Sequence, residues 1–108
     1  MAELDPADEA SCVVEVSDES GMPVIRLSGE LDLVTVDSVR AAMDAVLTEA
    51  TERLIFEVSE LEFMDSSGIA LLVSASRKAE KVELRNPTLI VRRLIELTGL
   101  AELLIMVP

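Results

Sequence analysis

Apolar positions along the chain follow two spacings, and the change between them predicts where strands and helices lie. Residues 12–17 and 24–27 are β-prone and largely alternate, and the turn-forming residues 18–23 between them predict a hairpin. From position 36 to 50, apolar residues recur at steps of three and four. This spacing predicts an amphipathic helix, with Thr35 as its N-cap.

The rest of the chain continues to alternate strands with helices. We expect a buried strand at 53–58, a helix at 66–78, a strand at 82–85, a helix from the Asn86-Pro87 cap to Gly99, and a last strand at 103–107. Residues 28–32 and 59–65 are expected to be connecting loops. Alternating strands and helices favour βαβ units, so the expected fold class is α/β. It is a mixed, mostly parallel sheet with an N-terminal β-hairpin and about three main helices.

Composition sets the kind of core and the number of domains. The chain has 108 residues, of which 50% are hydrophobic and only 2% aromatic, so a single domain with an aliphatic core is expected. We assign this domain to residues 11–108 and expect residues 1–10 to be an acidic, flexible N-terminus. With no long apolar run and no signal-peptide pattern, the expected location is the cytoplasm. Cys12, the only cysteine, is expected to be a small buried hydrophobe in a strand.

Charge and residue types exclude several classes of function. The formal net charge is −12, with 17 acidic and 3 basic residues in the first 65 positions and 4 acidic and 6 basic residues thereafter. So acidic a chain repels phosphate groups, which argues against nucleic acid or an anionic membrane as a partner and is compatible with a basic protein. There is no histidine, and the four glycines form no phosphate-binding loop. Histidine-dependent nucleophiles and zinc sites are therefore excluded, and we expect no cofactor and no enzyme.

The most informative stretch is Asp65-Ser66-Ser67-Gly68, where a loop is expected to end and a helix to begin. At about 100° per residue, a helical wheel places the core stripe on Ile69, Leu72, Val73 and Ser76. The opposite, outward side then carries Ser67, Leu71, Ser74 and Lys78. Ser66 falls at the edge of the core, so Ser67 is expected to be the reachable serine. Local chemistry alone favours a plain helix cap here.

An outward serine at a helix N-terminus is nevertheless a suitable phosphorylation site. A phosphate there would lie over free backbone N–H groups, at the positive end of the helix dipole. It would add about −1.5 to −2 charges to a surface on which a partner is docked, with little change in the fold.

Three stretches resemble one known family. Phe63-Met64-Asp65-Ser66-Ser67-Gly68 resembles the phosphorylation motif of anti-sigma-factor antagonists of the STAS domain family. Leu27-Ser28-Gly29-Glu30-Leu31-Asp32 resembles the family's second signature, and Leu94 with Leu97-Thr98-Gly99-Leu100 resembles the end of its third helix. One departure is the interval from Gly68 to Pro87, which has 18 residues and no glycine to end the second helix. The helix there is expected to be short, or the turn at 79–82 to be tight.

The resemblance implies a regulatory role. Unmodified antagonists bind an anti-sigma factor that is also a serine kinase, which frees the sigma factor. Phosphorylation of the serine before the motif glycine dissociates the complex, and a serine phosphatase restores it. Carried over to this chain, the acceptor is Ser67. The partner-binding residues are Asp65, Ser66, Ser67, Gly68, Leu71 and Ser74, with Gly29, Glu30 and Asp32 expected nearby at the same end of the sheet.

Other interpretations stay open at this point. Glu30, Asp32, Asp37 and Asp65 could gather at one end of the sheet and hold Mg²⁺, as in a receiver-like phosphoacceptor. A STAS module could instead be a scaffold within a stress-signalling complex.

Overall fold

The structure is a computed structural model that describes residues 11–108, so the expected N-terminal tail lies outside the described residues. Its elements in chain order are β1 (Cys12–Glu19), β2 (Met22–Leu31), α2 (Val36–Val46), β3 (Arg53–Met64), α3 (Ser66–Lys78), β4 (Lys81–Arg85), α4 (Leu89–Leu97), the 3-10 turn η1 (Leu100–Glu102) and β5 (Ile105–Val107). No helix within this range is long and apolar enough to cross a membrane.

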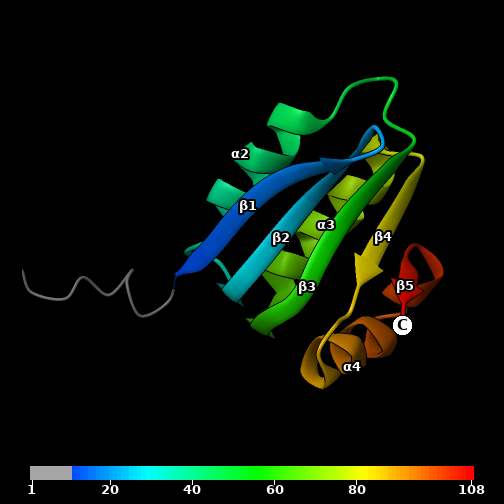
Figure 1. The fold of residues 1–108 in the computed structure, drawn as a ribbon. Helices are drawn as coiled ribbons and strands as arrows, with labels where there is room; N and C mark the ends of the chain where they lie inside the picture. The colour runs from blue at the N-terminus through cyan, green and yellow to red at the C-terminus, as the bar shows by residue number, and fades with distance from the viewer. Residues whose placement is uncertain (1–10) are drawn as a thin grey trace, which may run out of the picture.

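The five strands form one sheet in the order β1-β2-β3-β4-β5 (Figure 1). β1 pairs with β2 in antiparallel fashion, and the other neighbouring strands are parallel. The predicted α/β class, with a mostly parallel sheet and an N-terminal hairpin, is therefore confirmed. Because β2, β3 and β4 are parallel, their carboxyl ends point toward the same end of the sheet.

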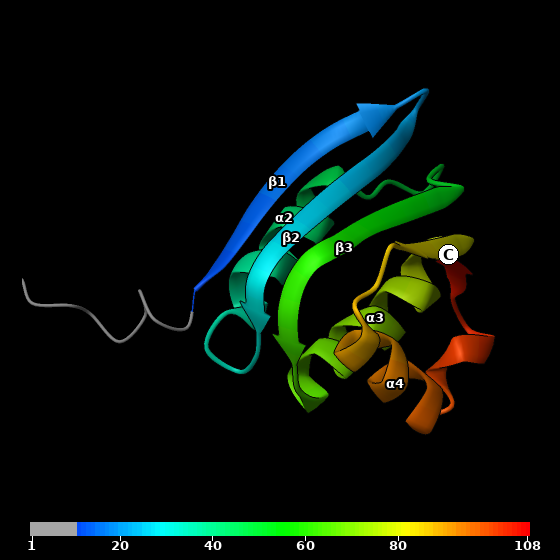
Figure 2. The same ribbon diagram turned by 60° about the horizontal axis from the view of Figure 1, so that its bottom comes forward.

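The helices pack on one side of the sheet, where the core lies. In Figure 1, α2 and α3 lie behind the strands, and Figure 2 shows α4 beside α3. A single core cluster joins residues of all three helices to the strands, including Val39 of α2, Leu72 of α3 and Ile95 of α4. Phe56 of β3 is fully buried within this cluster, and its other members are aliphatic residues and two methionines, Met43 and Met64. The composition therefore predicted the core correctly.

Two strands are longer than expected because they pair with each other. β3 runs to Met64 rather than ending at Val58, and β2 continues to Leu31 through the segment expected to be a loop. Their far halves stay paired, with Gly29 opposite Leu61 and Leu31 opposite Met64. The register of β2 against β3 shifts between Arg26 and Ser28 and again between Gly29 and Glu30. These irregularities interrupt the alternation of apolar and polar residues, so the pattern did not predict a strand here.

The ends of the last helix and strand also differ from the prediction. Thr88, and not Asn86, caps α4, because its hydroxyl accepts the Val91 N–H at 3.4 Å. Asn86 has a positive φ of 57° and donates its side-chain N–H to Glu57 instead. Gly99 ends the helix in the left-handed region as predicted, whereas the last strand is limited to Ile105–Val107.

The helix α3 has the predicted bounds but a different orientation. Its buried residues are Gly68, Leu71, Leu72 and Ala75, at steps of three and four. Leu71 is fully buried, so the expectation that it faces outward with Ser67 was wrong. Ile69 and Val73 are only half-buried. Apolar residues cover more than half of the circumference of α3, and periodicity alone therefore left its phase undecided.

Of the two alternatives for the interval from Gly68 to Pro87, a short helix or a tight turn, the structure shows the tight turn. α3 reaches Lys78, and Ala79 with an extended conformation ends it. Glu80 is then the only other residue before β4 begins. The helix is therefore ended without glycine, by an extended residue.

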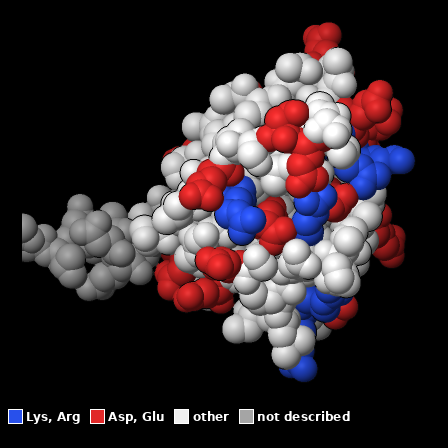
Figure 3. Space-filling model, viewed as in Figure 1, with Lys and Arg blue, Asp and Glu red and all other residues white. Residues whose placement is uncertain are grey.

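The face of the sheet opposite the helices carries ion pairs. Glu83 on β4 is buried, and its carboxylate accepts hydrogen bonds from Arg53 at 2.7 Å and from Arg85 at 2.9 Å. Arg85 also donates to Glu19 of β1 at 3.0 Å. Figure 3 shows basic and acidic side chains interleaved over the face viewed in Figure 1. Polar pairing thus lets this face stay free of a covering helix.

Acid should weaken the fold through Glu83. Burial by itself raises the pKa of this carboxyl, but the bonds from Arg53 and Arg85 outweigh it, so its pKa lies below the ordinary 4.5. A carboxyl with a lowered folded pKa contributes stability above its unfolded pKa, and this stability is lost as the pH falls through the folded pKa. We expect the free energy of unfolding in urea to fall below about pH 4.5, and Glu83→Gln to remove part of that fall. Glu96→Gln, at an exposed carboxyl on α4, should keep the wild-type dependence.

Truncation of Leu71 tests the orientation of α3. Because the side chain is fully buried, Leu71→Ala should lower the free energy of unfolding by about 2–5 kcal/mol. Arg77→Ala, at an exposed position of the same helix, should change it by only about 0.5 kcal/mol or less. A cost for Leu71→Ala as small as that of the control would contradict the packing described here.

Candidate functional site

The candidate site lies where β2 and β3 end and α3 begins. The two strand ends lie side by side in Figure 2, and the Asp65 N–H donates to the Leu31 carbonyl at 3.1 Å. This bond places the segment from Gly29 to Asp32 next to the start of α3. The sequence-based expectation that these two motifs meet at the same end of the sheet is confirmed.

Asp65 is the N-cap of α3. Its side-chain Oδ1 accepts the Ser67 N–H at 2.8 Å, and its carbonyl accepts from Gly68 and Ile69 at 3.0 and 3.2 Å. Asp65 itself has extended backbone angles, as N-cap residues do. The hydrogen bond between the Asp65 side chain and the Ser67 N–H, two positions later, thus sets where the helix starts.

The two serines are exposed in the opposite order to the prediction. Ser66, at the first helical position, is exposed, whereas Ser67 is half-buried. With the core side of α3 centred on Gly68, Leu71 and Ala75, Ser67 lies on the flank of the helix and Ser66 points away from the core. The expectation that Ser67 is the more accessible serine was therefore wrong, although its side chain is not enclosed. Ser74, two turns further along the same flank, is also half-buried.

Gly68 is required by packing between α3 and the strand ends. A Cβ at this position would lie 2.4 Å from Cγ of Met64, 2.7 Å from its Sδ and 3.0 Å from Cδ2 of Leu31. Because Met64 and Leu31 are themselves buried, neither has free space to move into. The glycine lets the protein's own strands, rather than a ligand, approach the first turn of the helix.

A different constraint requires glycine at position 29, namely its backbone conformation and its contact with Ser11. Its φ is +100°, and a Cβ there would lie 2.4 Å from the backbone oxygen of Ser11. The next residue, Glu30, donates its N–H to that same oxygen at 3.1 Å. Gly29 therefore brings the start of β1 against β2 and directs the chain toward the candidate site.

A hydrogen-bonded turn follows β2. Oδ1 of Asp32 accepts the N–H groups of Val34 at 2.9 Å and Thr35 at 3.1 Å. The Thr35 hydroxyl donates to the Glu30 carbonyl at 2.8 Å and accepts the Asp32 N–H at 3.0 Å. Thr35 stands at the N-cap position of α2 as predicted, but its side chain holds this turn and makes no cap hydrogen bond.

The turn exposes two aliphatic side chains that the sequence analysis missed. Leu33 and Val34 are 76% and 68% exposed, and Phe63 at the end of β3 is 44% exposed. Phe63 is paired with Glu30, so it belongs to the same end of the sheet. The sequence did contain a signal for this exposure, because the two apolar residues stand between the polar turn residues Asp32 and Thr35. A short turn has no interior in which it could bury them.

The magnesium hypothesis fails on geometry. Among residues 11–108, no three acidic or cysteine side chains gather closely enough to hold a metal ion. One oxygen each of Asp32 and Asp65 is already an acceptor for backbone N–H groups. Glu30, Asp32, Asp37 and Asp65 therefore do not gather into the carboxylate cluster of the receiver-like alternative.

Cys12 lies in β1 as predicted and is half-buried against the edge of the core. Burial raises the pKa of its thiol, which disfavours the reactive thiolate. The cysteine therefore acts as a small packing residue.

Comparison with known proteins identifies the family. The model of the Mlab, STAS domain family matches residues 14–108. The chain is 31% identical over 96 residues to an anti-sigma F factor antagonist of Paenibacillus polymyxa, which covers 84% of this chain and 82% of that protein.

Comparison with solved structures indicates the same family. An anti-sigma factor antagonist from Mycobacterium paratuberculosis superposes with a TM-score of 0.84 at 30% identity, covering 92% of this chain and 87% of its own. The unphosphorylated anti-sigma factor antagonist SpoIIAA gives a TM-score of 0.76 at 29% identity, covering 89% of each chain. The phosphorylated form of this Bacillus cell fate determinant gives 0.69 at 28% identity, covering 89% of this chain and 92% of that one. This chain belongs to the STAS domain family.

Proposed function

We propose that the protein is an anti-sigma-factor antagonist whose binding to an anti-sigma factor with serine kinase activity is switched off by phosphorylation of Ser67. It has no catalytic role of its own in this proposal, and a serine phosphatase restores the binding form. The observation that carries the proposal is the position of Ser67 in the first turn of α3, beside the segment from Gly29 to Asp32. Its relatives include proteins named anti-sigma factor antagonists.

The first turn of α3 is suited to carry a phosphate without unfolding. The Ser67 N–H is already bound by Asp65, and the flank position keeps the Ser67 side chain out of the core. A phosphate there would lie at the positive end of the helix dipole. The modification therefore acts on the surface and leaves the packing of Gly68 below it unchanged.

The surroundings explain how such a phosphate would break a complex. Glu30, Asp32 and Asp65 already place carboxylates at this end of the sheet. A phosphoserine adds about −1.5 to −2 charges and three strongly hydrated oxygens. A partner that tolerates the hydroxyl would have to remove water from this new charge, so the modified form would bind far more weakly.

The exposed side chains indicate the chemistry of the surface that the partner would present. Leu33, Val34 and Phe63 form the apolar part of the proposed interface, and the carboxylates form its charged part. The complementary surface is an apolar patch edged by lysine or arginine. Buried apolar anchors supply most of the affinity of such interfaces, whereas exposed charges mainly speed the encounter.

The decisive experiment combines the purified protein with candidate anti-sigma kinases and ATP. Phosphate should be incorporated at one site, and peptide mass mapping should place it on Ser67. Since Ser66 is the more exposed serine, phosphate on Ser66 alone would contradict the assignment. Self-assembly of the purified chain into large particles, without any kinase, would favour the scaffold interpretation.

Substitution of Ser67 separates folding from regulation. Ser67→Ala should keep the melting temperature within a few degrees and make anti-sigma factor binding insensitive to kinase and ATP. Ser67→Asp should weaken binding by about tenfold or more, since one carboxylate imitates phosphate only in part. Ser66→Ala is the matched control and should remain switchable. Calorimetry with and without ATP measures each of these outcomes.

Substitution of the exposed turn tests the apolar part of the interface. Leu33→Ser should weaken anti-sigma factor binding by about tenfold, corresponding to about 1–2 kcal/mol, with an almost unchanged free energy of unfolding. The control is Leu97→Ser on α4, because Leu97 is even more exposed at 84% and is not part of the proposed interface. Equal effects of the two substitutions on binding would argue against an interface at the turn.

A further inference from the structure

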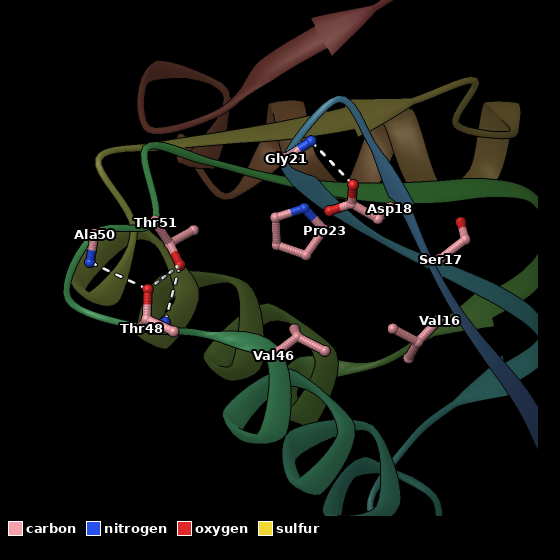
Figure 4. A pocket seen from close by; sticks show the side chains of 9 residues that line it. All are labelled: Val16, Ser17, Asp18, Gly21, Pro23, Val46, Thr48, Ala50 and Thr51. Carbon is pink, nitrogen blue, oxygen red and sulfur yellow. Dashed lines mark hydrogen bonds between the residues drawn. The ribbon is translucent and has the colours of Figure 1, made fainter.

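A groove lies at the other end of the sheet, between the tip of the β1–β2 hairpin and the end of α2. Its volume is about 580 Å³, within the range of small-molecule sites. It is lined by Val16, Ser17, Asp18, Gly21, Pro23, Val46, Thr48, Ala50 and Thr51 (Figure 4). None of these residues belongs to the candidate site around Ser67.

The groove has apolar side walls. Val16 on β1, Pro23 on β2 and Val46 on α2 surround the same space in Figure 4. Val16 is 48% exposed although it is a strand residue on the side of the sheet that the helices cover elsewhere. An apolar group in the groove would remove part of this surface from water.

The charged side chain among the lining residues is Asp18. Oδ2 of Asp18 accepts the Gly21 N–H at 2.9 Å, so the other carboxylate oxygen is not needed by the turn. The wall at Val46 is the end of α2, whose last turn holds no basic residue. The last carbonyls of a helix carry partial negative charge and favour cations.

Two threonine hydroxyls of the groove are bonded to backbone N–H groups of the turn after α2. Oγ1 of Thr48 accepts the Ala50 N–H at 3.1 Å, and Oγ1 of Thr51 accepts the Thr48 N–H at 2.9 Å. Both threonines therefore stabilise the turn after α2. Among residues 11–108, no lysine or arginine lines the groove. An anion would meet the Asp18 carboxylate without a cationic side chain to pair with, and a purely apolar molecule would cover Asp18 without giving it a partner.

From this combination we infer that the groove binds an organic cation with a short apolar stem, an alkyl ammonium or a guanidinium group. The stem packs between Val16, Pro23 and Val46, and the cationic head lies toward Asp18 and the end of α2. A free amine and a lysine or arginine side chain of a protein partner share this chemistry. The inference does not depend on the proposed function, because the groove and Ser67 are at opposite ends of the sheet.

The test is a titration of the ¹⁵N-labelled full chain with three probes that each have six carbon atoms: hexylamine, 1-hexanol and hexanoate. Hexylamine should shift amide signals of the groove residues, with saturation, while hexanoate should leave them in place and hexanol should bind more weakly. Asp18→Asn should weaken hexylamine binding by about threefold, as expected for one exposed ion pair. The asparagine carbonyl can still accept the Gly21 N–H, so the hairpin is retained.

Two further variants keep the test decisive. Glu96→Gln removes an exposed carboxyl elsewhere and should leave hexylamine binding unchanged. Val16→Ala should weaken the binding of hexylamine but not that of methylamine, which has no stem to pack against Val16. Equal shifts with hexanoate, or equal losses in Asp18→Asn and Glu96→Gln, would overturn the inference in favour of unspecific attraction to an acidic surface. An acetylated, amidated Leu-Lys-Leu peptide that binds more tightly than hexylamine identifies a protein partner as the source, and weaker binding identifies a small amine.

Discussion

The close contact of α3 with the ends of β2 and β3 is the constraint on which the site depends. A side chain at Gly68 would overlap Met64 and press against Leu31, so the helix can approach the strands only with glycine at this point. The same strand ends are joined by the bond from the Asp65 N–H to the Leu31 carbonyl. One glycine and one backbone hydrogen bond thus hold the first turn of α3 beside the segment from Gly29 to Asp32.

This arrangement separates the residues that fold the protein from the residues of the proposed switch. Gly68, Leu71 and Leu72 face the core, Asp65 caps the helix, and Ser67 lies on the flank between core and solvent. Charge added to such a flank changes what can dock there without entering the core. The Asp32–Thr35 turn works in a similar way, because its hydrogen bonds are internal while Leu33 and Val34 remain exposed.

The two faces of the sheet differ in the side chains they carry, and so do its two ends. The helices cover one face with an aliphatic core, whereas Glu83, Arg53 and Arg85 pair with one another on the other face. The end near Ser67 combines exposed apolar residues with carboxylates. The opposite end has the groove beside Asp18, bordered by the end of α2. A small domain with few aromatic residues therefore presents two surfaces of distinct chemistry.

Local periodicity, turn residues and the parallel order of strands were enough to predict the fold class, the bounds of α3, the aliphatic core and the meeting of the two motifs. The family followed from the motifs around Gly29 and Gly68. The phase of α3, the burial of Leu71 and the exposure of Ser66 were decided only by tertiary structure, since apolar residues lie on several sides of that helix. The extensions of β2 and β3, the exposure of Leu33 and the groove beside Val46 likewise require knowledge of what packs against each segment. Local sequence specifies which conformations are favourable, whereas contacts between distant segments select which side chains are covered.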